Sequence, residues 1–323
     1  MPAFDSIVNV EEWISDHYLT TDETKGASFS KRVAERIKLW KADEVSTEQD
    51  GPLSRFLSKR LDIQTSLATI DSDESNSSSQ IVQATQASSL IREAFGYGEI
   101  SQQEAQRGSD VLEYAGWAGN AGSVQLIEAM PVASPEDITS TPLLSPIVVS
   151  GVEQEATAAY LMGQLFLSDQ APAYIVCAAG SWVILAERET WPLGRYLAIN
   201  LGLVVERNDT KSKGEIQQTV VALARESTER SADGTTWWDE TIEQSRQHAV
   251  QVSGELRGSI RESIEVIGND ILNRRRALGL SIDDIDGAEL AKQALRYLYR
   301  ILFLLFAEAS PELEILPTGS PEY

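Results

Sequence analysis

The side chains that most often carry metal or nucleophilic chemistry are scarce in this sequence. It holds two histidines, His17 and His248, and one cysteine, Cys177. A zinc site takes several such ligands, and no Ser/His/Asp motif is visible, so we interpret both histidines as structural or surface residues. Cys177 lies in an apolar run, which predicts a buried and unreactive thiol.

The composition limits the class of protein. The 323 residues can bury a full core and predict two domains, and a hydrophobic fraction of 42% is ordinary for a soluble protein. No stretch reaches the roughly 20 apolar residues that a bilayer requires, and no signal peptide opens the chain. A single cysteine cannot form a disulfide within the chain, which fits a reducing compartment. We therefore expect a cytoplasmic protein that does not contact a membrane.

Acidic residues dominate the charge. The formal charge of −22 argues against phosphate binding over the whole surface. The excess lies mainly in residues 61–160, which hold 14 acidic and 2 basic residues, a net charge of −12. Other surfaces are closer to balance and stay candidates for DNA contacts.

Hydrophobic periodicity predicts an α+β protein with a helical N-terminus, a mixed-sheet α/β region and a helical C-terminal part. Helices are expected over 4–18, from Ser28 or Ser30 to about 41, over 81–95 and over 154–167. Residues 111–205 favour strands, with a hairpin formed by 174–178 and 182–186. The predicted parts are N-terminal helices (1–70), a polar loop (71–80), a mixed α/β domain (81–209) and a helical connector domain (210–323).

Two helices are predicted near the C-terminus. Apolar steps of three and four predict a long helix over about 241–278, with Trp237 and Trp238 as its hydrophobic anchor. The last helix, over 293–309, is apolar on nearly every side. Its uncharged run is too short for a membrane span, so we expect it to be buried in a core, with Leu302 and Leu305 enclosed.

The last helix also carries a family resemblance. Residues 295–317, LRYLYRILFLLFAEASPELEILP, are similar to the helical connector before the catalytic domain of large adenine-specific DNA methyltransferases. These enzymes occur in type IIG restriction-modification and in phage-defence systems. The chain resembles the DISARM methyltransferase most, and also the phage-growth-limitation and BREX types. The supporting segments are AERETWPLGRYL (186–197), ERND (206–209), GE (214–215), GTTWW (234–238) and LRGSIR (256–261).

The resemblance implies that the parent protein transfers a methyl group from S-adenosylmethionine to adenine N6. Family members act on a flipped adenine through an Asn-Pro-Pro-Tyr-type tetrapeptide, which does not occur here. Phe95-Gly-Tyr-Gly98 follows a helical pattern rather than a strand, so we interpret it as a turn. We expect no catalytic residues and no cofactor in this segment. S-adenosylmethionine is expected in the C-terminal methyltransferase domain of the full-length protein.

Type IIG relatives often begin with a PD-(D/E)xK nuclease domain, in which two acidic residues bind a metal and a lysine positions water. By this resemblance Glu128 takes one acidic position, and Asp110 or Glu113 the earlier one. Met130 stands where the lysine belongs, and residues 93–187 contain no lysine. We therefore expect a degenerate nuclease-like fold. An unrelated α/β arrangement is the main alternative.

Two basic clusters are candidates for weak, sequence-independent contacts with DNA phosphates. One ends the long helix, where it also complements the helix dipole. The other lies on the second N-terminal helix, where a solvated face is the alternative. The clusters are Arg274, Arg275 and Arg276, and Lys31, Arg32, Arg36 and Lys38.

These observations predict the N-terminal and connector portion of a DNA adenine methyltransferase from a phage-defence system. Its partners would be double-stranded DNA, the methyltransferase domain and other subunits of the system. One alternative is a free-standing acidic interaction protein that imitates DNA or acts as an adaptor. Another is a metal-dependent nuclease.

Overall fold

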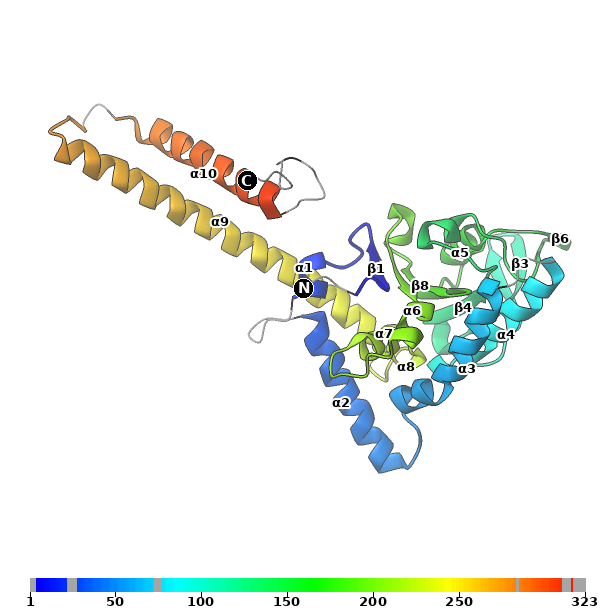
Figure 1. Cartoon of the computed structure of the whole chain (residues 1–323). Coiled ribbons are helices and arrows are strands. Elements are labelled where there is room, and N and C mark those ends of the chain that lie inside the picture. Colours follow the sequence, from blue (N-terminus) through cyan, green and yellow to red (C-terminus); the bar gives the residue numbers. More distant parts are fainter. Residues whose placement is uncertain (1–3, 22–27, 73–76, 283–284, 310–314, 316–323) are drawn as a thin grey trace. The chain divides into compact units, whose positions relative to one another are not determined.

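The computed structural model describes residues 4–21, 28–72, 77–282, 285–309 and 315 (Figure 1). Within these ranges it is a mixed α+β structure with ten α-helices and a nine-stranded mixed sheet, which confirms the predicted class. The chain divides into two compact units, Met1–His248 and Ala249–Tyr323. The first unit contains the sheet. The second contains the later part of α9 (Trp237–Ala277) and α10 (Gly287–Ala309).

The strands follow the order β1-β9-β8-β7-β4-β3-β5-β6, and β2 pairs with β3. β4 and β7 are parallel, and the other pairs are antiparallel. The predicted hairpin is confirmed as β7–β8, and its turn uses Gly180 at φ 67°. The strands are β1 Ile7–Val10, β2 Ser101–Arg107, β3 Asp110–Ala118, β4 Val124–Glu128, β5 Ile147–Val149, β6 Val152–Gln154, β7 Tyr174–Ala179, β8 Trp182–Glu187 and β9 Tyr196–Asn200.

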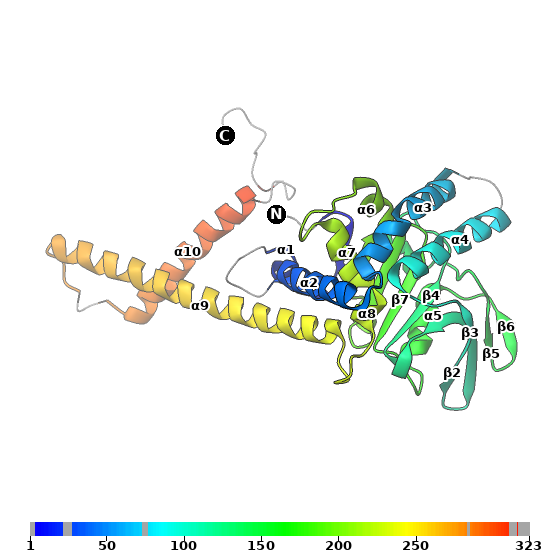
Figure 2. The same cartoon turned by 90° about the horizontal axis from the view of Figure 1, so that it is seen from below.

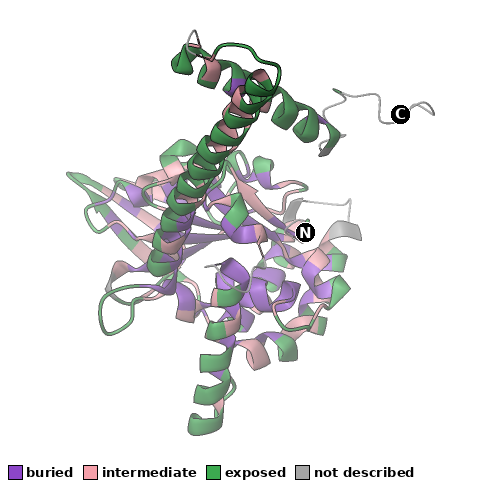
Figure 3. Cartoon of the chain, turned by 90° about the vertical axis from the view of Figure 1, so that its left-hand side faces the viewer, coloured by how far each residue is buried: buried purple, intermediate pink, exposed green. Residues whose placement is uncertain are grey.

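The central strands are buried on both faces (Figure 3). Along β7, Val176 enters a core with α2, α3, α4, α6, α7 and the first turns of α9, whereas Cys177 enters a second core with α5. Figure 2 shows α5 and the α3–α4 pair beside the sheet. The helices of this unit before α9 are α1 Asp16–Thr20, α2 Phe29–Thr47, α3 Pro52–Ser72, α4 Ser77–Phe95, α5 Ala158–Phe166, α6 Leu201–Arg207, α7 Glu215–Leu223 and α8 Arg225–Thr228.

The prediction of one helix over residues 4–18 is wrong. Residues Ile7–Val10 form β1 and pair antiparallel with β9. Glu11 and Glu12 then adopt φ 51° and 52°, which ends the strand before the short helix α1. The apolar spacing suits a helix, but the open edge of β9 supplies hydrogen bonds that a local pattern cannot reveal.

The polar stretch predicted as a loop over 71–80 is helical at both ends. α3 continues to Ser72 and α4 begins at Ser77, and residues 73–76 lie outside the described residues. The helix predicted over 81–95 is confirmed with an earlier start. The β2 strand was not predicted, because its polar sequence, SQQEAQR, has no apolar alternation and lies at a sheet edge.

The long helix α9 is confirmed, and a capping box fixes its start. The Thr236 hydroxyl accepts a hydrogen bond from the Asp239 backbone N–H at 3.0 Å, and the Asp239 carboxylate accepts one from the Thr236 backbone N–H at 2.8 Å. Asp239 also accepts the Tyr174 hydroxyl of β7 at 2.7 Å. The first turn of α9 is therefore joined directly to the sheet.

The end of α9 is a Schellman motif at Gly279, whose φ is 69°. The Leu280 N–H donates to the Arg275 carbonyl, and the Gly279 N–H donates to the Arg276 carbonyl, both at 3.0 Å. Asp286 then caps α10 by accepting the Ala288 N–H at 2.9 Å. No helix in the described ranges is long and apolar enough to cross a membrane.

Candidate functional site

Helix α10 exposes most of its apolar surface, so the prediction that it is buried is wrong. Leu302 is 44% exposed and Leu305 is 55% exposed. Ala294 and Ala307 are buried, and Leu290 approaches α9 at Gly268, 3.8 Å from a Cβ placed there. One helix covers only a stripe of another, and α10 is apolar around most of its circumference.

The exposure of Leu302 makes a direct prediction for stability. Leu302→Ala should change the free energy of unfolding by no more than about 0.5 kcal/mol, because little surface is removed from water there. Leu126→Ala is the matched control, because Leu126 is fully buried in β4 and its truncation should cost about 2–5 kcal/mol. Chemical denaturation measures both values. Equal losses would show that Leu302 is buried in solution.

Cationic side chains line α10 beside this apolar surface. Lys292, Arg296 and Arg300 follow each other at steps of four and are exposed. Lys292 lies 3.7 Å from Glu289. Arg296 and Arg300 form no ion pair with any described residue of the second unit. The surface therefore combines large apolar groups with two uncompensated guanidinium groups.

Glu128, at the end of β4, is the residue that the nuclease resemblance assigns to an acidic metal-binding position. In the structure it forms an ion pair with Arg92. The Arg92 Nε on α4 donates to the Glu128 carboxylate at 2.7 Å, and Arg92 Nη1 donates to the Gly98 carbonyl at 2.9 Å. Both side chains are enclosed, at 6% and 10% exposure. Burial raises the pKa of Glu128 above its ordinary value, and the nearby Arg92 charge opposes that shift.

The other nuclease-like positions do not converge on Glu128. A small cavity of about 20 Å³ beside Glu128 is lined by Tyr114 and Ala115 of β3, not by Asp110 or Glu113. Glu113 lies opposite Glu104 of β2, and Asp110 is exposed at the β2–β3 turn. Met130, just after β4, supplies a thioether where a lysine would be needed.

A metal ion of the nuclease type does not fit this arrangement. The guanidinium of Arg92 already neutralises Glu128, and a divalent cation there would be repelled. Among the described residues, no group of three or more His, Cys, Asp and Glu side chains is placed to hold a metal ion.

The glycines of Phe95-Gly-Tyr-Gly98 serve packing at the end of α4. Gly96 has φ 80°, and the Tyr97 N–H donates to the Arg92 carbonyl at 2.9 Å, which closes the helix. A Cβ on Gly98 would lie 2.6 Å from the Trp117 ring nitrogen. The interpretation as a turn is confirmed.

The four basic residues predicted to form one outer face of α2 do not share an environment in the structure. Lys31 and Lys38 are exposed. Arg32 is turned inward, 3.0 Å from Glu240 and 5.4 Å from the Trp237 ring of α9. Arg36 donates to the Glu226 carbonyl and lies over the Trp40 ring. Arg32 and Arg36 therefore hold α2 to the helices around it and do not belong to an outer basic face.

The three arginines at the end of α9 have separate local contacts. Arg274 pairs with Asp270 at 2.7 Å, and Arg275 donates to the Ser281 carbonyl at 3.0 Å. Arg276 donates to the Asn273 side chain at 3.5 Å. Arg274 and Arg276 are exposed and Arg275 is half-buried, so the three close the helix end and two of them fully face solvent.

Cys177 and the histidines are structural in the described geometry. Cys177 is fully buried, and burial raises the pKa of its thiol to about 12, as the apolar run predicted. His17 Nδ1 lies 2.7 Å from His248 Nε2, which joins α1 to α9. Sequence inspection did not reveal this pairing because 231 positions separate the two residues.

A second polar cluster also escaped the sequence interpretation. Glu215, the first residue of α7, is 1% exposed and accepts Arg207 Nη1 at 3.2 Å and the Ser6 hydroxyl. Arg207 also donates to Asp5 at 2.8 Å. Gly214 before Glu215 signals a helix start, but the Ser6 hydroxyl that donates to the Glu215 carboxylate lies 209 positions earlier in the chain.

Comparisons with known proteins give no relative: no family model, no curated protein and no solved structure matches the chain.

Proposed function

We propose that this chain is the N-terminal and connector portion of a S-adenosylmethionine-dependent adenine-N6 DNA methyltransferase from a bacterial phage-defence system. The observation that carries the proposal is the exposed apolar surface of α10. This helix is the same segment whose sequence resembles the connector before the catalytic domain. The chain does not perform the methyl transfer; it presents α10 as a docking surface for the domain that does.

The physical argument is the cost of leaving such a surface in water. Leu295, Tyr299, Leu302, Phe303 and Phe306 are each between 44% and 67% exposed. A contiguous apolar patch of this kind on a folded protein marks an interaction site. The two hydrophobic cores consist of residues from Ile7 to Ile242 and include no residue of α10.

In this proposal the first unit is a nuclease-like scaffold that has lost its chemistry. The succession of β2, β3 and β4, then α5 and the parallel strand β7, supports a relationship to the PD-(D/E)xK fold. Met130 and the Arg92–Glu128 pair support the loss of metal binding. The unit would guide DNA toward the catalytic cleft and dock other defence subunits in the cytoplasm, where host DNA is marked as self.

The coding sequence beyond Tyr323 tests this function. An Asn-Pro-Pro-Tyr-type motif following a glycine-rich turn, and methylation of adenine N6 by the purified full-length product, are the expected results. A coding region or operon without a methyltransferase domain would overturn the proposal and favour a free-standing interaction protein.

This chain should not cleave DNA. With Mg²⁺ or Mn²⁺, supercoiled plasmid should stay intact, because no lysine accompanies Glu128 and Arg92 occupies its carboxylate. Gel electrophoresis of the plasmid measures the result. Nicking that disappears in Glu128→Gln but persists in the exposed control Glu104→Gln would contradict the prediction.

The α9 arginines should contribute to DNA binding through charge alone. Replacing Arg274, Arg275 and Arg276 together with alanine should weaken binding equally for all sequences. It should also reduce the log–log salt slope by about 0.9 for each phosphate that is no longer neutralised. Fluorescence anisotropy at several salt concentrations measures both. If affinity and slope do not change in the full-length protein, the arginines close only the helix end.

A further inference from the structure

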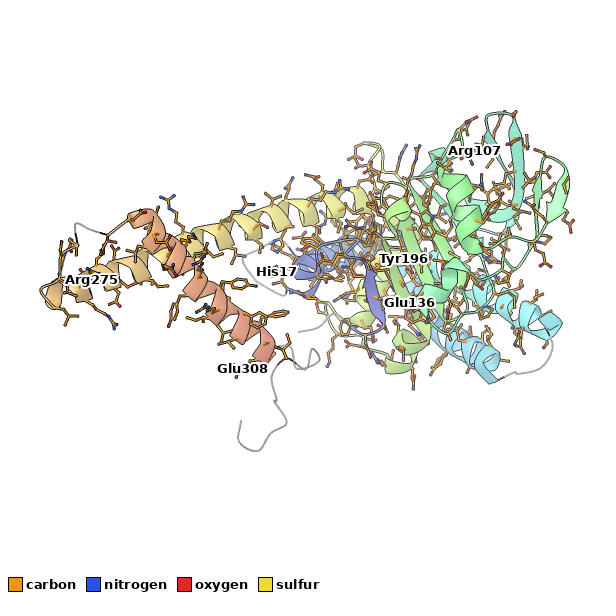
Figure 4. All side chains as sticks on the ribbon, turned by 90° about the horizontal axis from the view of Figure 1, so that it is seen from above. His17, Arg107, Glu136, Tyr196, Arg275 and Glu308 are labelled. Atoms are coloured by element: carbon orange, nitrogen blue, oxygen red, sulfur yellow. The ribbon has the colours of Figure 1, made fainter. Side chains whose placement is uncertain are left out.

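The outer face of α10 has an ordered arrangement of apolar and cationic side chains. Leu295, Tyr299, Leu302, Phe303 and Phe306 recur at steps of three and four, so they form one stripe along the helix. The stripe residues are turned from Ala294 by about a quarter to a half turn of the helix, and Ala294 and Ala307 are buried. Figure 4 shows the side chains of α10 standing out from the ribbon, with Glu308 near its end.

A row of cations borders the stripe. Lys292, Arg296 and Arg300 are spaced by four residues, so they wind along one edge of the stripe. Between Glu289 and Glu308 the helix contains no acidic residue. Arg296 and Arg300 therefore have no carboxylate on their own helix within one turn, and they form no ion pair with a described residue of the second unit.

We propose that α10 docks into an apolar groove of a folded protein domain, and that carboxylates on one rim of this groove pair with Arg296 and Arg300. This inference rests on the proposed function for the identity of the domain, the methyltransferase catalytic domain. The groove follows from the stripe, since an apolar helix face binds such grooves through residues at these spacings. The carboxylates follow from the arginines, since a guanidinium covered without a partner is costly.

Two other binding partners would match either the apolar stripe or the two arginines, but not both. A second copy of α10 would bring Arg296 and Arg300 against an equally cationic edge, with no carboxylate in the stripe to meet them. A nucleic acid would pair with the arginines but leave Leu302, Phe303 and Phe306 against phosphate and sugar. An acidic, apolar protein groove satisfies both halves.

Site-specific photo-crosslinking in the full-length protein tests the inference. The probe is p-benzoyl-phenylalanine in place of Phe303, and mass spectrometry identifies the crosslinked peptide. We expect one segment that combines apolar residues with Asp or Glu. Arg296→Glu/Arg300→Glu should reduce the crosslink yield by roughly tenfold or more, because like charges would then meet at the rim. Arg257→Glu, an exposed arginine on α9, is the matched control and should retain the yield.

The outcomes separate this inference from the proposed function. Crosslinks to a methyltransferase domain at a segment without carboxylates, or yields that do not change on charge reversal, would overturn the acidic groove and leave the function standing. Charge-sensitive crosslinks to an acidic groove of another protein would support the groove and overturn the function. Crosslinks to a second copy of α10 or to nucleic acid would overturn the groove. Equal thermal midpoints of the variants exclude unfolding as the cause.

Discussion

Replacing Arg92 with alanine is expected to reduce the free energy of unfolding by about 3–5 kcal/mol, because it leaves the Glu128 carboxylate buried without its partner. The Arg92 side chain is 6% exposed and contacts Glu128 at 2.7 Å and the Gly98 carbonyl at 2.9 Å. Both acceptors lose a charge-assisted donor when the guanidinium is removed. Urea denaturation at neutral pH measures the loss.

The matched control is Lys59→Ala, which breaks the exposed Lys59–Glu93 pair between α3 and α4. Such a pair contributes about 0–1 kcal/mol, so the control should change little. Replacing Arg92 and Glu128 together with leucine should recover much of the loss, because the uncompensated charge is then removed as well. A loss below about 1 kcal/mol in Arg92→Ala would show that Glu128 reaches solvent.

The loss in free energy of unfolding caused by Arg92→Ala should also depend on pH. Burial raises the pKa of Glu128 above its ordinary value of 4.5, so the folded chain holds this proton more tightly than the unfolded chain. The stability from this group is therefore greatest below the unfolded pKa and falls as pH rises through the folded pKa. Without Arg92, which lowers the pKa, the folded value rises further. The deficit should be smaller near pH 4.5 than at pH 7, and an equal deficit at both would contradict this explanation.

The second large effect is expected at Trp238, the residue that anchors α9. Trp238→Ala should cost about 3–5 kcal/mol, the range for truncating a fully buried aromatic residue. Trp238 is 0% exposed, its ring lies 4.8 Å from that of Trp13, and its ring N–H donates to the Ala222 carbonyl at 2.9 Å. The variant removes packing with α7 and with the N-terminal segment at once.

Tyr299→Ala is the control for Trp238→Ala, because Tyr299 is 67% exposed on α10. Its truncation should stay within about 0.5 kcal/mol. Thermal unfolding followed by circular dichroism compares the two variants. If Trp238→Ala unfolds at the temperature of the unmodified chain, the anchoring role of the first turn of α9 is wrong.

Local chemistry in the sequence determined the regular elements and their ends. Ser28 caps α2 by accepting the Lys31 N–H at 3.3 Å, as a serine before a helical run predicts. Gly279 ends α9, and Gly180 forms the β7–β8 turn, because both adopt positive φ angles that other residues rarely take. The apolar run around Cys177 predicted a buried thiol, and Cys177 is buried. These features depend on neighbours in the chain, so one sequence is enough to find them.

Tertiary structure decided where each surface faces and which charges meet. Residues 7–10 became a strand because β9 offered an edge, although their spacing suits a helix. Arg32 turned inward because Glu240 and Trp237 lie 208 and 205 positions away in the chain. The partner of Glu128 is Arg92, 36 positions earlier and on another element. Helix α10 is exposed although its apolar composition predicted burial. An apolar composition indicates that a helix packs against another surface, but it does not identify that surface.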